Sequence, residues 1–350
     1  MSIKCRCYVF ILIASVMTLL NVKGHSACRE FTKAVAAINS SLFLQDDGTV
    51  WAAGSNSSGE LGVGGSTSFR TNYMVQVSDL AHVVDIAAGG SHCLAVLDDG
   101  TVWAWGANSS GELGDGTQNG SNVPVQVNLP PTVRAVAVTA GTSFSVALMD
   151  DGAVWTWGRN TVGQLGTGSF ASTVTPVKIP SFEAKAIDAG AEFCLAIRKS
   201  DNVVCAWGRN NVGQLGDGTI LTRTSPTPTF GSFTALGISA GQAFSLAIRL
   251  ADNVVFGWGD NQDGQLGDNT IVNKSVPTST FGALKAKQVA AGSSSSFAIA
   301  LATNTVYSWG NGVNGVLGSG VLDDNLVPAQ IYISDLSVAS RINASNVVFA

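Results

Sequence analysis

DDGTVWAWGANSSGELGDG, residues 98–116, is the stretch that decides the fold of this chain. Other segments repeat its pattern, beginning at Asp46, Asp150, Ser200, Ala251 and Ala302. The leucine of their shared Leu-Gly pair recurs every 50 to 52 residues, at positions 61, 113, 165, 215, 266 and 317. A long fixed period indicates a propeller or a stacked array, because each unit buries its apolar face only against its neighbours.

The alternation of side chains within each repeat predicts β-strands. In the VWAW segment, residues 102–105, successive side chains point to opposite faces, and the preceding Asp-Asp-Gly is a hairpin turn signal. No helix-length apolar pattern follows the N-terminal segment. We therefore expect four short strands per repeat, which in the second repeat cover residues 85–88, 92–97, 101–105 and 124–127. Four antiparallel strands per repeat are typical of a propeller blade.

A second motif lies between the copies of the first and predicts how the ring closes. It reads DIAAGGSHCLAVL from Asp85, has further copies from residues 137, 186, 237 and 288, and has degenerate copies from residues 34 and 337. This motif therefore occurs once more than the first. The excess predicts a seven-bladed ring whose last blade, 337–350, has only its two inner strands, with an open edge partly covered by residues 28–31. A six-bladed ring and a chain truncated from a longer one are the alternatives. The six full blades are predicted at 33–82, 83–133, 134–183, 184–235, 236–286 and 287–336.

The two motifs together resemble the regulator of chromosome condensation repeat family. The DG-x-V-x-x-WG-x-N-x-x-GQLG core and the AAG strand pair are both present in repeated copies over about residues 33–350. The resemblance implies an all-β propeller with seven blades. The tryptophan before each Trp-Gly glycine is expected to pack between neighbouring blades, at residues 105, 157, 207, 258 and 309.

Composition narrows the possible partners. The 350 residues carry a net charge of −5 and only 12% are charged, whereas 45% are hydrophobic, which argues against disorder. The chain lacks the basic surface that binding to phosphates requires, so we expect no nucleic-acid partner.

The N-terminus predicts export. Lys4 and Arg6 precede an apolar run from Tyr8 to Leu20, and small residues follow up to Ala27. A run of 13 residues is shorter than the roughly 20 that span a bilayer. We therefore expect residues 1–27 to be a cleaved signal peptide, and residues 28–350 to be one secreted or extracytoplasmic propeller domain without a transmembrane span. Lipidation of Cys28 is the alternative.

The remaining cysteines and histidines offer little chemistry. Cys93, Cys194 and Cys205 are expected to be buried free thiols, although a Cys194–Cys205 disulfide is possible. His92 falls where other repeats have phenylalanine, which favours packing over catalysis. The sequence lacks a nucleophile elbow, an HExxH motif and a P-loop, and the run 260–264 misses the EF-hand spacing. We expect no enzymatic activity, no cofactor and no metal.

One end of the propeller is the candidate binding face. The loops between the first and second strands and between the third and fourth strands of every blade emerge at the same end. The residues that they are expected to present for binding are Glu60, Glu112, Arg159, Gln164, Arg209, Gln214 and Asp260. Arg159 and Arg209, on adjacent blades, could bind a carboxylate. The alternative is that such polar residues only satisfy their own turns.

The sequence therefore predicts an exported, non-catalytic and monomeric scaffold that binds a protein or a cell-surface ligand. The family resemblance implies a first alternative, which is guanine-nucleotide exchange on a Ran-like small GTPase. A lyase or hydrolase site at the axis is the second alternative, with Asp85 and Asp188 as its candidate residues.

Overall fold

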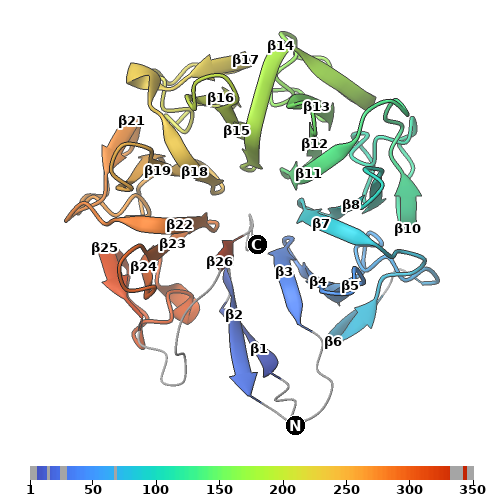
Figure 1. The fold of residues 1–350 in the computed structure, drawn as a ribbon, viewed down its shortest axis with the longest axis horizontal. Coiled ribbons are helices and arrows are strands. Elements are labelled where there is room, and N and C mark those ends of the chain that lie inside the picture. The colour runs from blue at the N-terminus through green and yellow to red at the C-terminus, as the bar shows by residue number, and fades with distance from the viewer. Residues whose placement is uncertain (1–5, 14–15, 24–29, 67–68, 332–341, 345–350) are drawn as a thin grey trace.

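The structure is a computed structural model that describes residues 6–13, 16–23, 30–66, 69–331 and 342–344 of the chain. The sheets surround a common axis, and each turns one edge strand toward it (Figure 1). The predicted all-β propeller is therefore confirmed. Within the described residues, no helix has the length and apolar character needed to cross a membrane.

We number the blades along the chain, and each has its strands in sequence order from the axis outward. The first blade contains β3 (Phe31–Ala36), β4 (Ser40–Gln45), β5 (Val50–Ser55) and β6 (Arg70–Gln76). The second blade contains β7 (Val83–Ala88), β8 (His92–Leu97), β9 (Val102–Gly106) and β10 (Ser121–Gln126). The third blade contains β11 (Ala135–Ala140), β12 (Phe144–Met149), β13 (Ala153–Gly158) and the first part of β14 (Thr173–Ala189). The fourth blade contains the rest of β14 with β15 (Phe193–Arg198), β16 (Val204–Gly208) and β17 (Arg223–Pro228). The fifth blade contains β18 (Ala235–Ala240), β19 (Phe244–Arg249), β20 (Val255–Gly259) and β21 (Lys274–Ser279). The sixth blade contains β22 (Ala286–Ala291), β23 (Ser295–Ala300), β24 (Val306–Gly310) and β25 (Asn325–Gln330). Two short 3-10 turns, Phe230–Ser232 and Val313–Gly315, lie between strands.

Strand β14 serves two blades. Its first part, up to Glu183, pairs with β13 as the outer strand of the third blade. From Ala184 onward it pairs with β15 as the inner strand of the fourth. The predicted boundary between residues 183 and 184 falls at this change of partner.

The sheet between the sixth and first blades differs from the predicted half blade. It contains β26 (Ile342–Ala344), β2 (Val16–Lys23) and β1 (Arg6–Ile13), and β26 also contacts β22 and β3. Among the described residues, the strand that pairs with β26 is β2, from the N-terminal segment. The rest of the predicted half blade, 337–341 and 345–350, lies outside the described residues. The physical reason is that a strand edge with free backbone groups pairs with whichever strand reaches it. Seven blades, with six as the alternative, and cleavage of residues 1–27 remain predictions.

The core lies between adjacent blades, as predicted for the tryptophans. Trp105, Trp157, Trp207, Trp258 and Trp309 are all completely buried. Trp157 Nε1 donates a hydrogen bond of 2.7 Å to the backbone oxygen of Glu112, on the preceding blade. The glycine of the Leu-Gly pair permits this approach, because a Cβ on Gly114 would lie 2.8 Å from the Trp157 ring.

Candidate functional site

The two sets of loops share one end of the propeller, as predicted. The backbone nitrogen of Arg159 donates to the oxygen of Ser143 at 2.9 Å, which joins a third-to-fourth-strand loop to a first-to-second-strand loop. Arg209 forms the same bond with Glu192 at 2.9 Å. We call this end the loop face.

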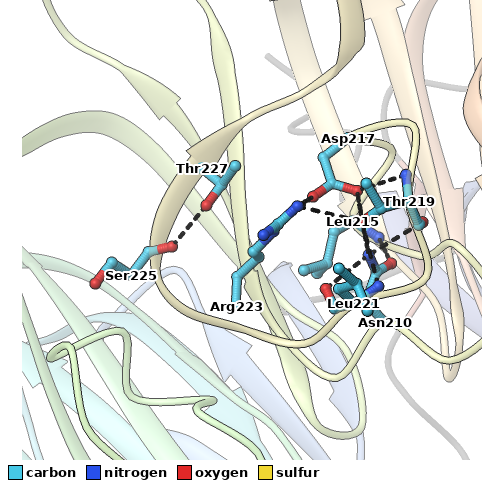
Figure 2. Close-up of polar contacts among 8 residues, drawn as sticks. All are labelled: Asn210, Leu215, Asp217, Thr219, Leu221, Arg223, Ser225 and Thr227. Atoms are coloured by element: carbon cyan, nitrogen blue, oxygen red, sulfur yellow. Dashed lines mark hydrogen bonds and ion pairs between the residues drawn. The ribbon is translucent and has the colours of Figure 1, made fainter.

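An asparagine organises the long loops of the first five blades from inside, and Gly312 takes its place in the sixth. In the fourth blade, Asn210 Oδ1 accepts the backbone N–H of Leu215 at 3.0 Å, and Nδ2 donates to the backbone oxygen of Leu221 at 3.0 Å (Figure 2). Asn56, Asn108, Asn160 and Asn261 accept the equivalent leucine N–H in other repeats. This asparagine is therefore part of the loop frame, because both ends of its amide are used within the loop.

An ion pair closes the same loop in the fourth blade. Asp217 lies 2.6 Å from Arg223 Nη2, and its side chain is only 3% exposed (Figure 2). Burial alone would raise the pKa of Asp217, but hydrogen bonds from Thr219 and Arg223 outweigh burial and lower this pKa. Asp217 is therefore a charged, structural group of the loop.

Four of the predicted binding residues lie inside these loops. Glu60, Glu112, Gln164 and Gln214 are at most 4% exposed. Each side-chain oxygen accepts the backbone N–H of the residue two positions earlier, at 2.8 to 3.0 Å. The structure thus places them in the turns, as the alternative interpretation expected, and we leave Glu60, Glu112 and Gln164 out of the surface proposed below.

The two arginines of the predicted cationic pair have different surroundings. Arg159 is exposed, and its Nε donates to Thr161 Oγ1 at 3.0 Å. Arg209 Nε lies 2.5 Å from Glu192 Oε2, so its charge is already balanced. The predicted carboxylate site would therefore rest mainly on Arg159.

A cavity of about 400 Å³ opens on the loop face between the fourth and fifth blades. It brings together three of the predicted residues, Arg209, Gln214 and Asp260. Its other lining residues are Ala191, Glu192, Asn211, Val212, Gln242, Ala243 and Gln262. Sequence reasoning missed Glu192, although a signal was present: the equivalent position holds serine or alanine in other repeats, at residues 91, 143, 243 and 294.

Asp260 is the least compensated charge in this cavity. Its Oδ2 accepts a hydrogen bond of 3.2 Å from Gln265, whereas its buried Oδ1 has no hydrogen-bond partner. Burial raises the pKa of Asp260 and the nearby carboxylate of Asp263 adds to the rise, which outweighs the lowering by hydrogen bonds from the backbone of Gln262 and Asn261 and from the Gln265 side chain. Among the described residues, no lysine or arginine forms an ion pair with Asp260.

Exposed aliphatic pairs occur in the long loops of three successive blades. They lie in the long loops of the fourth, fifth and sixth blades, at the same positions in the fourth and fifth and one residue earlier in the sixth, and are 50% to 68% exposed. The pairs are Ile220–Leu221, Ile271–Val272 and Val321–Leu322. The second repeat has the polar pair Gln118–Asn119 at this place.

The axial channel, about 440 Å³, contains the two carboxylates considered for catalysis. Asp85 forms a 2.6 Å ion pair with Lys33 of the first blade and accepts the backbone N–H of Val138 of the third. Asp188 accepts the backbone N–H of Ala240 at 2.8 Å, and burial raises its pKa. Both side chains therefore connect neighbouring inner strands.

His92 and three cysteines, Cys93, Cys194 and Cys205, are buried packing residues. His92 Nε2 lies 2.9 Å from Ser145 Oγ, and burial lowers the pKa of His92 to about 4. Cys93, Cys194 and Cys205 are free and buried, as predicted, because strand pairing places Cys194 opposite Trp207 rather than opposite Cys205. Cys28 lies outside the described residues.

Comparison with known proteins identifies the family. A family model described as the RCC1-like domain matches residues 16–348. The chain is 29% identical to the ultraviolet-B receptor UVR8 of Arabidopsis thaliana over 314 residues, covering 87% of this chain and 71% of the receptor. It is 32% identical to the human probable E3 ubiquitin-protein ligase HERC6 over 294 residues, covering 81% of this chain but only 29% of HERC6.

Solved structures agree with this assignment at the level of the fold. Yeast RCC1 (Prp20), solved with Kap60, superimposes with a TM-score of 0.76 at 24% identity, covering 87% of this chain and 75% of that one. Human WBSCR16 gives 0.78 at 22% identity, covering 91% and 85%. The chain belongs to the RCC1-like domain family and folds as an RCC1-type β-propeller.

Proposed function

We propose that this propeller is an exported, non-catalytic scaffold that binds a protein or a cell-surface ligand through the loop face of its fourth to sixth blades. The observation that carries the proposal is the series of exposed aliphatic pairs on these blades. Exposed apolar surface costs about 25 cal/mol per Å², and extended apolar patches on soluble proteins mark interaction sites.

The repeat itself supports this interpretation. The Leu-Gly pair recurs in all six repeats and the asparagine in the first five, so they explain the shape of the loop. The outward residues differ between blades: the second has Gln118–Asn119 where the fourth has Ile220–Leu221. Since the same loop folds with either pair, folding does not require the aliphatic residues. A surface that varies on a constant frame suits recognition of one partner.

The alternatives have less support. Asp85 and Asp188 already connect inner strands, which leaves a lyase or hydrolase without a free axial carboxylate among the described residues. Nothing in the loop geometry favours guanine-nucleotide exchange. Export rests on the N-terminal sequence pattern alone.

Site-specific photo-crosslinking tests the scaffold function. A photoreactive amino acid would replace Leu221 on the loop face, and in a matched variant it would replace Tyr73, which is 69% exposed on β6 of the first blade. Each protein would be added to the surface fraction and medium of the producing cells. We expect one saturable adduct from position 221, competed by unlabelled protein and weakened by an added Ile271→Asp substitution.

Equal adducts from positions 221 and 73, or no adduct from 221, would contradict the scaffold proposal. An adduct of twice the chain mass would identify a second copy as the partner and contradict the expected monomer.

A further inference from the structure

We propose that the cavity between the fourth and fifth blades binds a basic side chain, with a guanidinium or ammonium head, carried by the partner of the loop face. That this partner is a protein rests on the function proposed above. The chemistry of the cavity does not, because it follows from the residues that line it.

The charges around the cavity favour a cation. Glu192 and Asp260 contribute two negative charges and Arg209 one positive charge, so the lining has a net charge of −1 when all three are ionised. Arg209 is already bound to Glu192, with 2.5 Å between Nε and Oε2. An incoming carboxylate would meet a neutralised arginine and the unpaired charge of Asp260, whereas an incoming cation would meet that unpaired charge directly.

Asp260 is held in a state that a cation would stabilise. The protein has partly removed this carboxylate from water, and its Oδ1 lacks a hydrogen-bond partner. A buried polar atom without a partner destabilises the folded protein, and charge-assisted hydrogen bonds are about twice as strong as neutral ones. A guanidinium or ammonium group reaching Asp260 would therefore supply the missing counter-charge.

The repeat pattern shows that the acid is not needed for folding. The position of Asp260, directly after the Trp-Gly pair, holds Arg159 and Arg209 in the two preceding repeats and Asn311 in the next. The backbone nitrogens of Arg209 and Asp260 make the same bond to the neighbouring loop, at 2.9 and 3.0 Å. The loop therefore accepts either charge, and the acid at 260 is a local feature of this cavity.

The remaining lining matches the rest of a basic side chain. Ala191, Val212 and Ala243 offer apolar contacts for its alkyl part. Gln242 and Gln262 offer amide groups beside the charge. The volume of about 400 Å³ lies within the roughly 300–1,000 Å³ of small-ligand sites.

The test uses small probes and the whole chain. Nα-acetyl-L-arginine amide is titrated into 15N-labelled protein, and backbone and side-chain amide shifts are followed by NMR at low salt. Nα-acetyl-L-glutamate amide and Nα-acetyl-L-glutamine amide are the anionic and neutral comparisons. We expect the arginine probe alone to shift Gln242 and Gln262 saturably.

Two substitutions inside the cavity should act in opposite directions. Asp260→Asn keeps the shape and removes the negative charge, so the dissociation constant of the arginine probe should rise about tenfold. Arg209→Gln removes the competing cation and frees Glu192, so the same constant should fall. Asp323→Asn, an exposed loop residue of the sixth blade outside the cavity, is the matched control and should leave the constant unchanged.

The proposal is overturned if millimolar arginine probe shifts none of the cavity residues, or if the glutamate probe binds there and binds more tightly to Asp260→Asn. Thermal melting checks that each variant folds. A titration without binding would contradict only the cation site, because the crosslink from position 221 tests the scaffold function independently. The reverse result, binding of the arginine probe with no adduct from 221, would remove the scaffold function only.

Discussion

Glutamate and glutamine are interchangeable at one position of this repeat because only one side-chain oxygen is needed there. Glu60 and Glu112 fill it in two blades, and Gln164 and Gln214 fill it in two others. In every case an oxygen atom accepts a backbone N–H within the loop. A charge at this position is therefore dispensable in these blades, and only the sixth repeat, with Val316 there, has no side-chain acceptor.

Glu112 provides the test of this equivalence. Glu112→Gln keeps the acceptor for the Ser110 N–H, so we expect the free energy of unfolding to change by less than about 0.5 kcal/mol. Glu112→Ala leaves that N–H without its partner and should cost about 1–3 kcal/mol. Urea denaturation of the two variants measures the difference. Equal losses for both would mean that the carboxylate charge, not the acceptor, stabilises the loop.

The burial of His92 predicts that the free energy of unfolding falls at acidic pH. Its pKa in the folded protein is about 4, against an ordinary value of 6.5 for histidine, because burial disfavours the charged ring. The unfolded chain therefore binds the proton more readily, and the stabilising effect of a neutral His92 is complete above about pH 6.5. This effect is lost as the pH falls toward 4, by up to about 3 kcal/mol.

His92→Phe should reduce this pH dependence. Phenylalanine occupies the equivalent position at 144, 193 and 244, and glycine leaves room for either ring, since a Cβ on Gly89 would lie 2.3 Å from His92. Ser145 keeps its hydrogen bond to the Glu112 oxygen. Unfolding free energies at pH 7.5 and 5.0 should differ less for the variant than for the natural chain. Parallel losses in the two proteins would contradict the assignment to His92.

At the scale of elements, one hydrogen bond recurs at four junctions between neighbouring blades, from Trp105, Trp157, Trp207 and Trp309, whereas Trp258 Nε1 has no hydrogen-bond partner within the part of the chain that the structure describes. Trp207 Nε1 donates to the Gln164 oxygen at 3.0 Å, and the Leu-Gly glycine of the preceding blade, Gly166, packs against the same ring. The GQLG segment is therefore an interface element as well as a turn. Its glutamine closes the loop with its side chain and receives the tryptophan with its backbone.

Alanine substitutions at two glycines of one loop can distinguish the cost of losing this tryptophan contact from the cost of backbone strain in the turn. Gly166 and Gly168 both have positive φ, +69° and +86°. A Cβ at 166 would lie 2.7 Å from Trp207 Nε1, but one at 168 would meet only Ser225 Oγ at 3.7 Å. Gly168→Ala should cost about 1–2 kcal/mol from backbone strain, and Gly166→Ala about 1–3 kcal/mol more from overpacking. Denaturant midpoints measure both, and equal costs would contradict a role for the tryptophan contact.

The strands could be predicted from the sequence, but the surface of the loops could not. Alternation and turn signals act over a few residues, so the predicted segment 92–97 is observed as β8 with the same bounds. The burial of Glu112 or Gln214 depends on a loop that folds back over eleven residues through Asn210 and Leu221. The cavity also combines loops of two blades, so Glu192 joins Asp260 only once the ring is assembled.

At the scale of the whole molecule, the sheet that closes the ring and the predicted signal peptide use the same residues, so the two are incompatible in one mature chain. Its strands β1 and β2 come from residues 6–23, the same residues whose pattern predicts a signal peptide. Cleavage after Ala27 would remove both strands and leave β26 without the strand that it pairs with. A circular array gains its last interface only when its ends meet, so processing should weaken the ring at this point.

A chain that begins at residue 28 should therefore differ from the full chain near the closure and not elsewhere. We expect a lower denaturant midpoint, and faster amide exchange in β3 and β22, the strands that contact β26. Strands β12 and β15, on the far side of the ring, are the internal control and should exchange at the same rate in both proteins (Figure 1). Identical exchange in β3 and β22 would show that β1 and β2 contribute nothing to closure. Mass spectrometry of the protein recovered from the producing cells then decides which form they contain: an intact N-terminus would contradict the signal peptide, and a product starting near Cys28 would confirm its cleavage.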